Sequence, residues 1–107
     1  MSLDVYLTAA RPTEVFSSNI THNLNKMAEA AGIYQHLWRP DEIGVTKAVQ
    51  LIDPLTEELR LLEADPAKFR LFNAENGWGK YENLVEFVRE YRDACAADPD
   101  ANIGVSR

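Results

Sequence analysis

The sequence predicts an α+β fold that is mainly α-helical, in which a small two-stranded sheet pairs the N- and C-terminal strands. Leu3, Val5 and Leu7 alternate with polar residues at one end of the chain. Ile103 and Val105 alternate in the same way at the other end, and this two-residue period is typical of a half-buried strand. An isolated strand pair is only marginally stable, so its apolar face is expected to lie against helices. The 107 residues are expected to form a single compact domain.

The first helix is expected to begin at Ser17 or Ser18 and to end at Gly32. A serine hydroxyl can cap the free amides of a first turn, and glycine is favoured where a helix ends. At about 100° per residue, one stripe of this helix is predicted to face the core: Ile20, Leu24, Met27 and Ala31. Asn23 borders this stripe and is expected to contact the core, whereas His22 points almost the opposite way.

Proline and aspartate pairs divide the middle of the chain. A helical region is expected over residues 46–64, and Asp53-Pro54 predicts a break inside it. Proline lacks an amide hydrogen and suits the first position of a new helix with aspartate as its cap. Asp65-Pro66 repeats this signal and predicts a further short helix.

The strongest helical periodicity spans residues 81–97. Its acidic residues lie opposite a broad apolar arc, which contains Leu84, Val85, Phe87, Val88, Tyr91 and Cys95. This helix is expected to form the centre of the core.

Composition and charge argue against several classes of partner. Seventeen acidic and eleven basic residues give a net charge of −6, which disfavours duplex nucleic acid because phosphate neutralisation supplies most of that affinity. The longest apolar runs fall far short of the roughly 20 residues needed to cross a bilayer, and the start resembles no secretory signal. The single Cys95 fits a reducing compartment. We therefore expect a cytoplasmic protein without a membrane partner.

Neither a catalytic residue, a metal site nor a cofactor is predicted. His22 and His36 are fourteen residues apart, far from the spacing that places two metal ligands on one helical face. The serines lack a nucleophile-elbow context, and Cys95 lies on an apolar arc, where a thiol is usually inert. A paired-carboxylate mechanism, for example through Asp41 and Glu42, stays open because spacing alone does not reveal it.

The start of the first helix is the first candidate ligand site. Asn19, His22 and Asn23 could present amide and imidazole groups to a polar ligand. The alternative is helix capping together with exposed polar residues, because Ser and Asn are favoured at helix starts for local reasons. Since His22 faces away from the core, its use in binding predicts that another segment covers it.

Trp38 and Arg39 are the second candidate. A flat aromatic ring beside a guanidinium group can grip a base, a phosphate or a carboxylate. The alternative is a tryptophan that fills the edge of the core and an arginine that pairs with Asp41 or Glu42.

The stretch Asn76-Gly77-Trp78-Gly79 is the third candidate. Glycines on both sides of a tryptophan allow a sharp turn and the close approach of another molecule. With Asn76 and Tyr81, Trp78 could form a stacking floor with hydrogen-bonding edges. The alternative is a turn before the last helix in which Trp78 is tucked inward.

Four blocks of the chain together carry a resemblance: NITHNLNKMAEAAGIY, LWRPDEIG, NGWGKYENLVEFV and PDANIGVSR. In this order they resemble a group of short, uncharacterised proteins of bacteriophages and bacteria, over nearly the whole chain. The resemblance implies an intracellular, phage-associated protein, which would act in the host cytoplasm. A role in phage–host interplay follows only by analogy.

The candidate blocks predict a non-catalytic binding module for a small polar or nucleotide-like ligand. They concentrate in the connections of the chain, where binding groups commonly sit on a rigid scaffold. The alternative is a protein-interaction module, either a homodimer or an inhibitor of a basic host protein, whose acidic exterior steers association. A small enzyme of unknown reaction is the third hypothesis.

Overall fold

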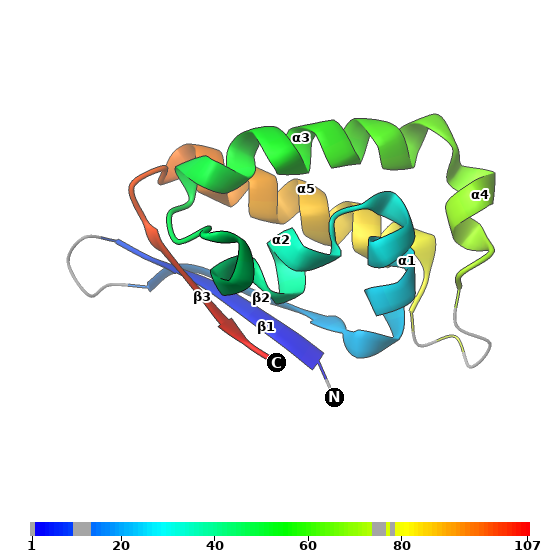
Figure 1. The fold of residues 1–107 in the computed structure, drawn as a ribbon, viewed down its shortest axis with the longest axis horizontal. Helices are drawn as coiled ribbons and strands as arrows, with labels where there is room; N and C mark the ends of the chain where they lie inside the picture. Colours follow the sequence, from blue (N-terminus) through cyan, green and yellow to red (C-terminus); the bar gives the residue numbers. More distant parts are fainter. Residues whose placement is uncertain (1, 10–13, 74–76, 78) are drawn as a thin grey trace.

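The computed structural model describes residues 2–9, 14–73, 77 and 79–107. Within these residues a three-stranded antiparallel sheet is covered on one face by helices (Figure 1). The strands are β1 Ser2–Thr8, β2 Glu14–Thr21 and β3 Asn102–Ser106, in the spatial order β2-β1-β3. The helices are α1 Asn25–Ala31, α2 Tyr34–Trp38, α3 Val49–Ala64, α4 Pro66–Arg70 and α5 Tyr81–Ala97, with 3-10 turns η1 His22–Leu24 and η2 Pro40–Ile43. This is the mainly helical α+β fold that the sequence predicts.

The pairing of the two terminal strands is confirmed. Val5 of β1 lies opposite Val105 of β3, and Leu7 lies opposite Ile103 in the same antiparallel register. Leu3, Val5 and Leu7 are fully buried. Because successive side chains of a strand point to opposite faces, these residues form the helix-covered side of the sheet.

The predicted helix start at Ser17 or Ser18 is wrong, because residues Glu14–Thr21 form the strand β2. This strand pairs antiparallel with β1, with Ser18 opposite Val5 and Ile20 opposite Leu3. Pairing with the central strand and burial of Ile20 outweigh the local preference of Ser and Asn for helix caps. The sheet therefore has a third strand that the sequence does not predict.

The four residues of the predicted apolar stripe are nevertheless all buried: Ile20, Leu24, Met27 and Ala31. They come from a strand, a 3-10 turn and a helix rather than from one helix. The predicted orientations of His22 and Asn23 are reversed, since His22 is half-buried and Asn23 is exposed. The reason is local: the Asn23 amide donates to Oγ1 of Thr21 at 3.3 Å, which starts a 3-10 turn instead of continuing a helix.

The predicted break at Asp53-Pro54 is also wrong, because α3 continues through Pro54. Leu51 and Leu55, on either side of this proline, are fully buried. Their burial holds both halves of the helix in place although one backbone hydrogen bond is lost. The short helix after Asp65 is confirmed as α4, where Oδ1 of Asp65 accepts from the Lys68 amide at 3.3 Å.

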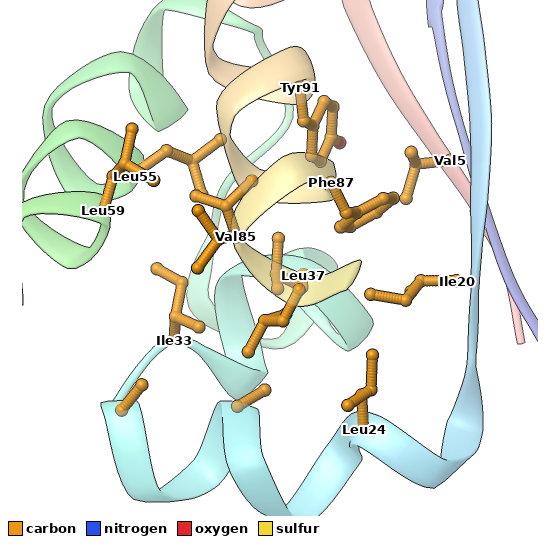
Figure 2. Packing of buried hydrophobic residues seen from close by; sticks show 14 of the residues in the cluster. Val5, Ile20, Leu24, Ile33, Leu37, Leu55, Leu59, Val85, Phe87 and Tyr91 are labelled. Carbon is orange, nitrogen blue, oxygen red and sulfur yellow. The ribbon is translucent and has the colours of Figure 1, made fainter. Parts of the chain in front are cut away.

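The predicted central helix is confirmed with the same bounds as α5, and its whole apolar arc is buried. Figure 1 shows α5 between α3 and the sheet. Figure 2 shows Phe87 of α5 and Val5 and Ile20 of the sheet pointing into the space between helix and sheet. Across the described residues, no helix is long and apolar enough to span a membrane.

Candidate functional site

Strand β2 and helix α5 lie side by side and run in opposite directions. At one end, the ring of Phe16 stacks on that of Tyr91 with a centroid distance of 5.9 Å. At the other end, Gly79 lies so close to Asn23 that an added Cβ would be 3.2 Å from the Asn23 Cβ. The positive φ of +146° at Gly79 also suits glycine. Residue numbers therefore rise along β2 while they fall along α5.

A groove of about 280 Å³ lies between these two anchor points. Residues 18–21 of β2 form one wall, and Asn83, Glu86, Phe87 and Glu90 of α5 line the other. Ile20 and Phe87 are only 5% and 4% exposed, so they give the groove an apolar base. Its rims are polar, with Ser18 on the strand and two glutamates on the helix.

The strand wall of this groove is a sheet edge. β1 is the only strand that pairs with β2 among residues 2–9, 14–73, 77 and 79–107. In such a strand every second residue turns its N–H and C=O away from the partner strand. The sequence EVFSSNIT contains none of the lysines or prolines that commonly protect an edge. Residues Phe16 to Thr21 pair with β1 in a regular register. The register shifts between Leu7 and Thr8 of β1, before this stretch of β2 begins.

The helix wall carries two carboxylates without partners. Every arginine in the described part of the chain forms an ion pair: Arg39–Glu42, Arg60–Glu57, Arg70–Glu82, Arg89–Glu63, Arg92–Asp93 and Arg107–Asp41. Glu86 and Glu90, by contrast, have no ion pair or hydrogen bond within the described residues. They are one helical turn apart, where like charges repel weakly. A cation placed between them would relieve this repulsion.

A second cluster lies around Trp38. The rings of His22 and Trp38 meet at an interplanar angle of 69° with their centroids 6.2 Å apart, and the ring of Tyr34 stacks on that of Trp38 at 5.4 Å. Arg39 donates to the Tyr34 hydroxyl at 3.2 Å and to Glu42 at 2.8 Å. These two hydrogen bonds raise the pKa of Arg39 further above its usual range.

This second cluster is largely closed by its own contacts. Trp38 is 2% exposed, so ligand stacking on its ring would require Tyr34 or His22 to move. The segment that covers His22 is Trp38 itself, and Nε2 of His22 is buried with no hydrogen-bond partner among the described groups. The ion pair of Arg39 with Glu42 would have to break before the guanidinium group could form a bidentate contact with a ligand.

The remaining predicted site residues are dispersed. Tyr81 donates from its hydroxyl to the Leu62 carbonyl at 2.6 Å, and the Arg70 guanidinium lies 5.0 Å from the centre of its ring. Burial is the main cause that raises the pKa of Tyr81. Tyr81 thus contacts α3 and α4, whereas Asn19 lines the groove on β2. Asn76 and Trp78 lie outside the described residues.

The structure brings Asn23, from the predicted first helix, next to Gly79, the last residue of the third candidate stretch. Sequence reasoning missed the groove residues Ser18, Glu86 and Glu90. The two glutamates were visible on the polar side of the 81–97 helix. The strand wall opposite them is not predicted, because the sequence favours a helix for residues 17–21.

Metal binding and thiol chemistry can be assessed in the described part of the chain. No group of three or more His, Cys, Asp or Glu residues there could hold a metal ion. Burial raises the pKa of the Cys95 thiol to about 12, which keeps it protonated and poorly nucleophilic. Comparison with protein-family models, curated proteins and solved structures finds no match to this chain.

Proposed function

We propose that the protein is a non-catalytic binding module that holds a basic segment of a partner protein in the groove between β2 and α5. One observation carries this proposal: among the described residues, the outer edge of β2 pairs with no other strand, and it faces two carboxylates without partners across an apolar base. Opposite charges steer encounter and select partners. The net charge of −6 adds a long-range attraction for cationic proteins.

A small polar or nucleotide-like ligand suits this groove less well. Phosphate groups would lie beside Glu86 and Glu90 and be repelled by them. A shallow groove fits side chains of a longer molecule better than a whole small one. The resemblance to bacteriophage proteins makes a basic host protein the partner class that we favour.

The test compares two double variants that each remove two negative charges. Glu86→Gln with Glu90→Gln changes the groove, whereas Glu29→Gln with Asp53→Asn changes exposed acids on α1 and α3. Binding is followed by fluorescence anisotropy with labelled lysine-rich, glutamate-rich and uncharged heptapeptides and with labelled ATP. We expect only the lysine-rich peptides to bind the native protein. The groove variant should weaken this binding at least about tenfold, and the control variant less than about twofold.

Two results would reject the proposal. Equal weakening by the two double variants would mean that net charge, not the groove, attracts the peptide. Binding of ATP without binding of basic peptides would instead favour the small-ligand hypothesis. Both variants should fold, because all four substituted side chains are exposed. Circular dichroism checks that they do.

A further inference from the structure

The two walls of the groove match in length and in period. Residues 18–21 of β2 span about 10 Å along a strand, and α5 rises about 10.5 Å from Asn83 to Glu90. Glu86 and Glu90 are separated by a rise of about 6 Å. Side chains on the same side of an extended strand repeat every 6.8 Å or so. An extended chain in the groove could therefore present one side chain to each glutamate.

We propose that the ligand is an extended peptide with lysine or arginine at every second position, which adds to β2 as a fourth strand. This inference rests on the proposed function and specifies how the partner segment is bound. The outward N–H and C=O groups of β2 would supply the main-chain hydrogen bonds, as in other cases of strand addition. The side chains that point toward α5 would supply selectivity.

Lysine and arginine fit the chemistry of the groove on the α5 side. Ser18 and Ile20 face the helix, because they lie opposite the buried Val5 and Leu3. An added strand would send alternate side chains over the apolar base formed by Ile20 and Phe87. The aliphatic part of a lysine or arginine can cover such a surface while its charged end stays at the polar rim. At that rim, the charged end would meet Glu86 or Glu90.

A second copy of this chain fits the groove poorly. Its β2 strand has the sequence EVFSSNIT, which contains no lysine or arginine. Pairing of two β2 strands in one continuous sheet would bring Glu86 and Glu90 of both copies near each other, and like charges across an interface are unfavourable. The charge of the groove thus selects a basic partner over self-association.

Two peptide isomers test the alternation directly. The heptapeptides TKTKTKT and KTTKTTK have the same composition and charge, but only the first places lysines two residues apart on one side of a strand. We expect TKTKTKT to bind the native protein at least about tenfold more tightly, since KTTKTTK can place only one lysine at a time beside Glu86 and Glu90. On binding, amides between Phe16 and Thr21 should exchange more slowly with deuterium.

Backbone pairing is tested with two further isomers of TKTKTKT, each with two N-methyl groups. One carries them on the first two lysines and the other on the two inner threonines. Only alternate amides of an added strand face β2, so one isomer should lose about tenfold in affinity while the other binds nearly as the parent does. Equal affinities of both isomers with the parent would exclude main-chain pairing.

A matched pair of variants tests the side of β2 that is used. Ser18→Lys would place an ammonium group from β2 itself beside Glu86 and Glu90, and it should weaken TKTKTKT binding at least about tenfold. Ser17→Lys makes the same exchange on the opposite face of the strand, where it should change affinity less than about twofold. Equal effects of the two variants would count against the inference.

The outcomes separate this inference from the proposed function. Equal binding of TKTKTKT and KTTKTTK, with both weakened by Glu86→Gln and Glu90→Gln, would keep the groove as the binding site and reject strand addition. Displacement of TKTKTKT by spermidine at equal charge concentration would show that the groove recognises cations without a backbone, which also rejects it. Failure of both peptides to bind would reject the inference and the proposed function together.

Discussion

The two edges of the sheet differ in how the rest of the chain protects them. At the β3 edge, the Ile103 amide donates to the Thr46 carbonyl at 2.9 Å, and Lys47 forms an isolated bridge with Asn102. The end of the chain is also held, because Arg107 donates to the Trp38 carbonyl at 2.9 Å. The β2 edge has no comparable cover among the described residues, although β2 has eight residues and β3 only five.

This difference indicates that exposure of β2 is not a general feature of the sheet. An unprotected strand edge invites pairing with other chains, and natural proteins usually cover or charge it. Here the shorter edge is covered and the longer one faces a groove with unpartnered glutamates. This contrast supports the proposal that the β2 edge binds a partner, and substitutions on each edge test whether the two edges behave as differently as their contacts indicate.

The largest effect is expected for a residue on which both edges depend. Leu7 of β1 is fully buried and lies opposite both Phe16 of β2 and Ile103 of β3. Leu7→Ala should lower the free energy of unfolding by about 2–5 kcal/mol, because it removes buried methyl groups and leaves a cavity. Urea denaturation measures this change. Val15→Ala, at the exposed start of β2, serves as the control and should change stability by less than about 0.5 kcal/mol.

A smaller loss of stability is expected for substitutions of the two residues that lie opposite Tyr6. This residue lies opposite Gly104 on β3 and opposite Ser17 on β2. Its ring covers Gly104 so closely that an added Cβ would be 2.5 Å from Cδ2 of Tyr6. Gly104→Val should therefore lower the free energy of unfolding by about 1–3 kcal/mol, as measured by urea denaturation.

The matched exchange on the other edge is Ser17→Val. Ser17 is exposed, and valine is well suited to a strand, so stability should change by less than about 0.5 kcal/mol. Equal losses in the two variants would mean that the Tyr6 ring moves away from Gly104 at little cost. The two edges of the sheet would then tolerate a valine equally well, contrary to the difference that their contacts indicate.

The elements that the sequence predicts well are those whose burial follows a clear period. Val5 and Val105 alternate with polar neighbours, and Phe87 and Tyr91 belong to a helical arc that is buried on α5. For such segments one periodic face contacts the core along its whole length. The local pattern and the tertiary contacts then agree.

Strand β2 could not be predicted in this way. Ser18 faces α5 at a position where a strand fully covered by the core would carry an apolar residue. Together with Ser17 and Asn19, it has the local hydrogen-bonding preferences of a helix cap. Only pairing with β1, a non-local interaction, fixes this segment as a strand. The candidate groove escapes prediction for the same reason, although the sequence does predict that the acidic residues of the last helix lie on its polar side.

The cover of the β3 edge can be weakened without touching β3. Oε1 of Gln50 accepts from the Thr46 and Lys47 amides at 2.9 Å each, and its amide group donates to the Gly44 carbonyl at 3.1 Å. Gln50→Ala should lower the free energy of unfolding by about 1 kcal/mol, because water replaces these exposed hydrogen bonds in part. Hydrogen exchange should accelerate at the Ile103 amide and stay unchanged in β2.

A control for Gln50→Ala is Gln35→Ala, a substitution of an exposed side chain on α2. The hydrogen-exchange rate of the Ile103 amide should be the same in this variant as in the native protein. Faster exchange in β2 and β3 alike after Gln50→Ala would mean that the segment before α3 stabilises the whole sheet rather than one edge.

The smallest effect concerns two glutamates on α5, one paired and one facing the open edge. Glu82 bonds to Arg70 at 2.9 Å, whereas Glu86 has no such partner within the described residues. Glu86→Gln should raise the free energy of unfolding by about 0.2–0.5 kcal/mol, because it removes the repulsion of Glu90 one turn away. The gain should shrink in high salt, which screens exposed charges.

Glu82→Gln should instead lower the free energy of unfolding, and this change should depend on pH. A hydrogen bond from its own backbone amide and then Arg70 lower the pKa of Glu82 in the folded state. Its ionised form therefore stabilises the fold above the unfolded pKa of about 4.3, and this contribution disappears as the pH falls through the lower folded value. Urea denaturation at neutral pH should show Glu82→Gln less stable and Glu86→Gln more stable than the native protein. Loss of stability in both variants would mean that Glu86 contributes to the fold, and the argument that it is kept for a cationic ligand would fail.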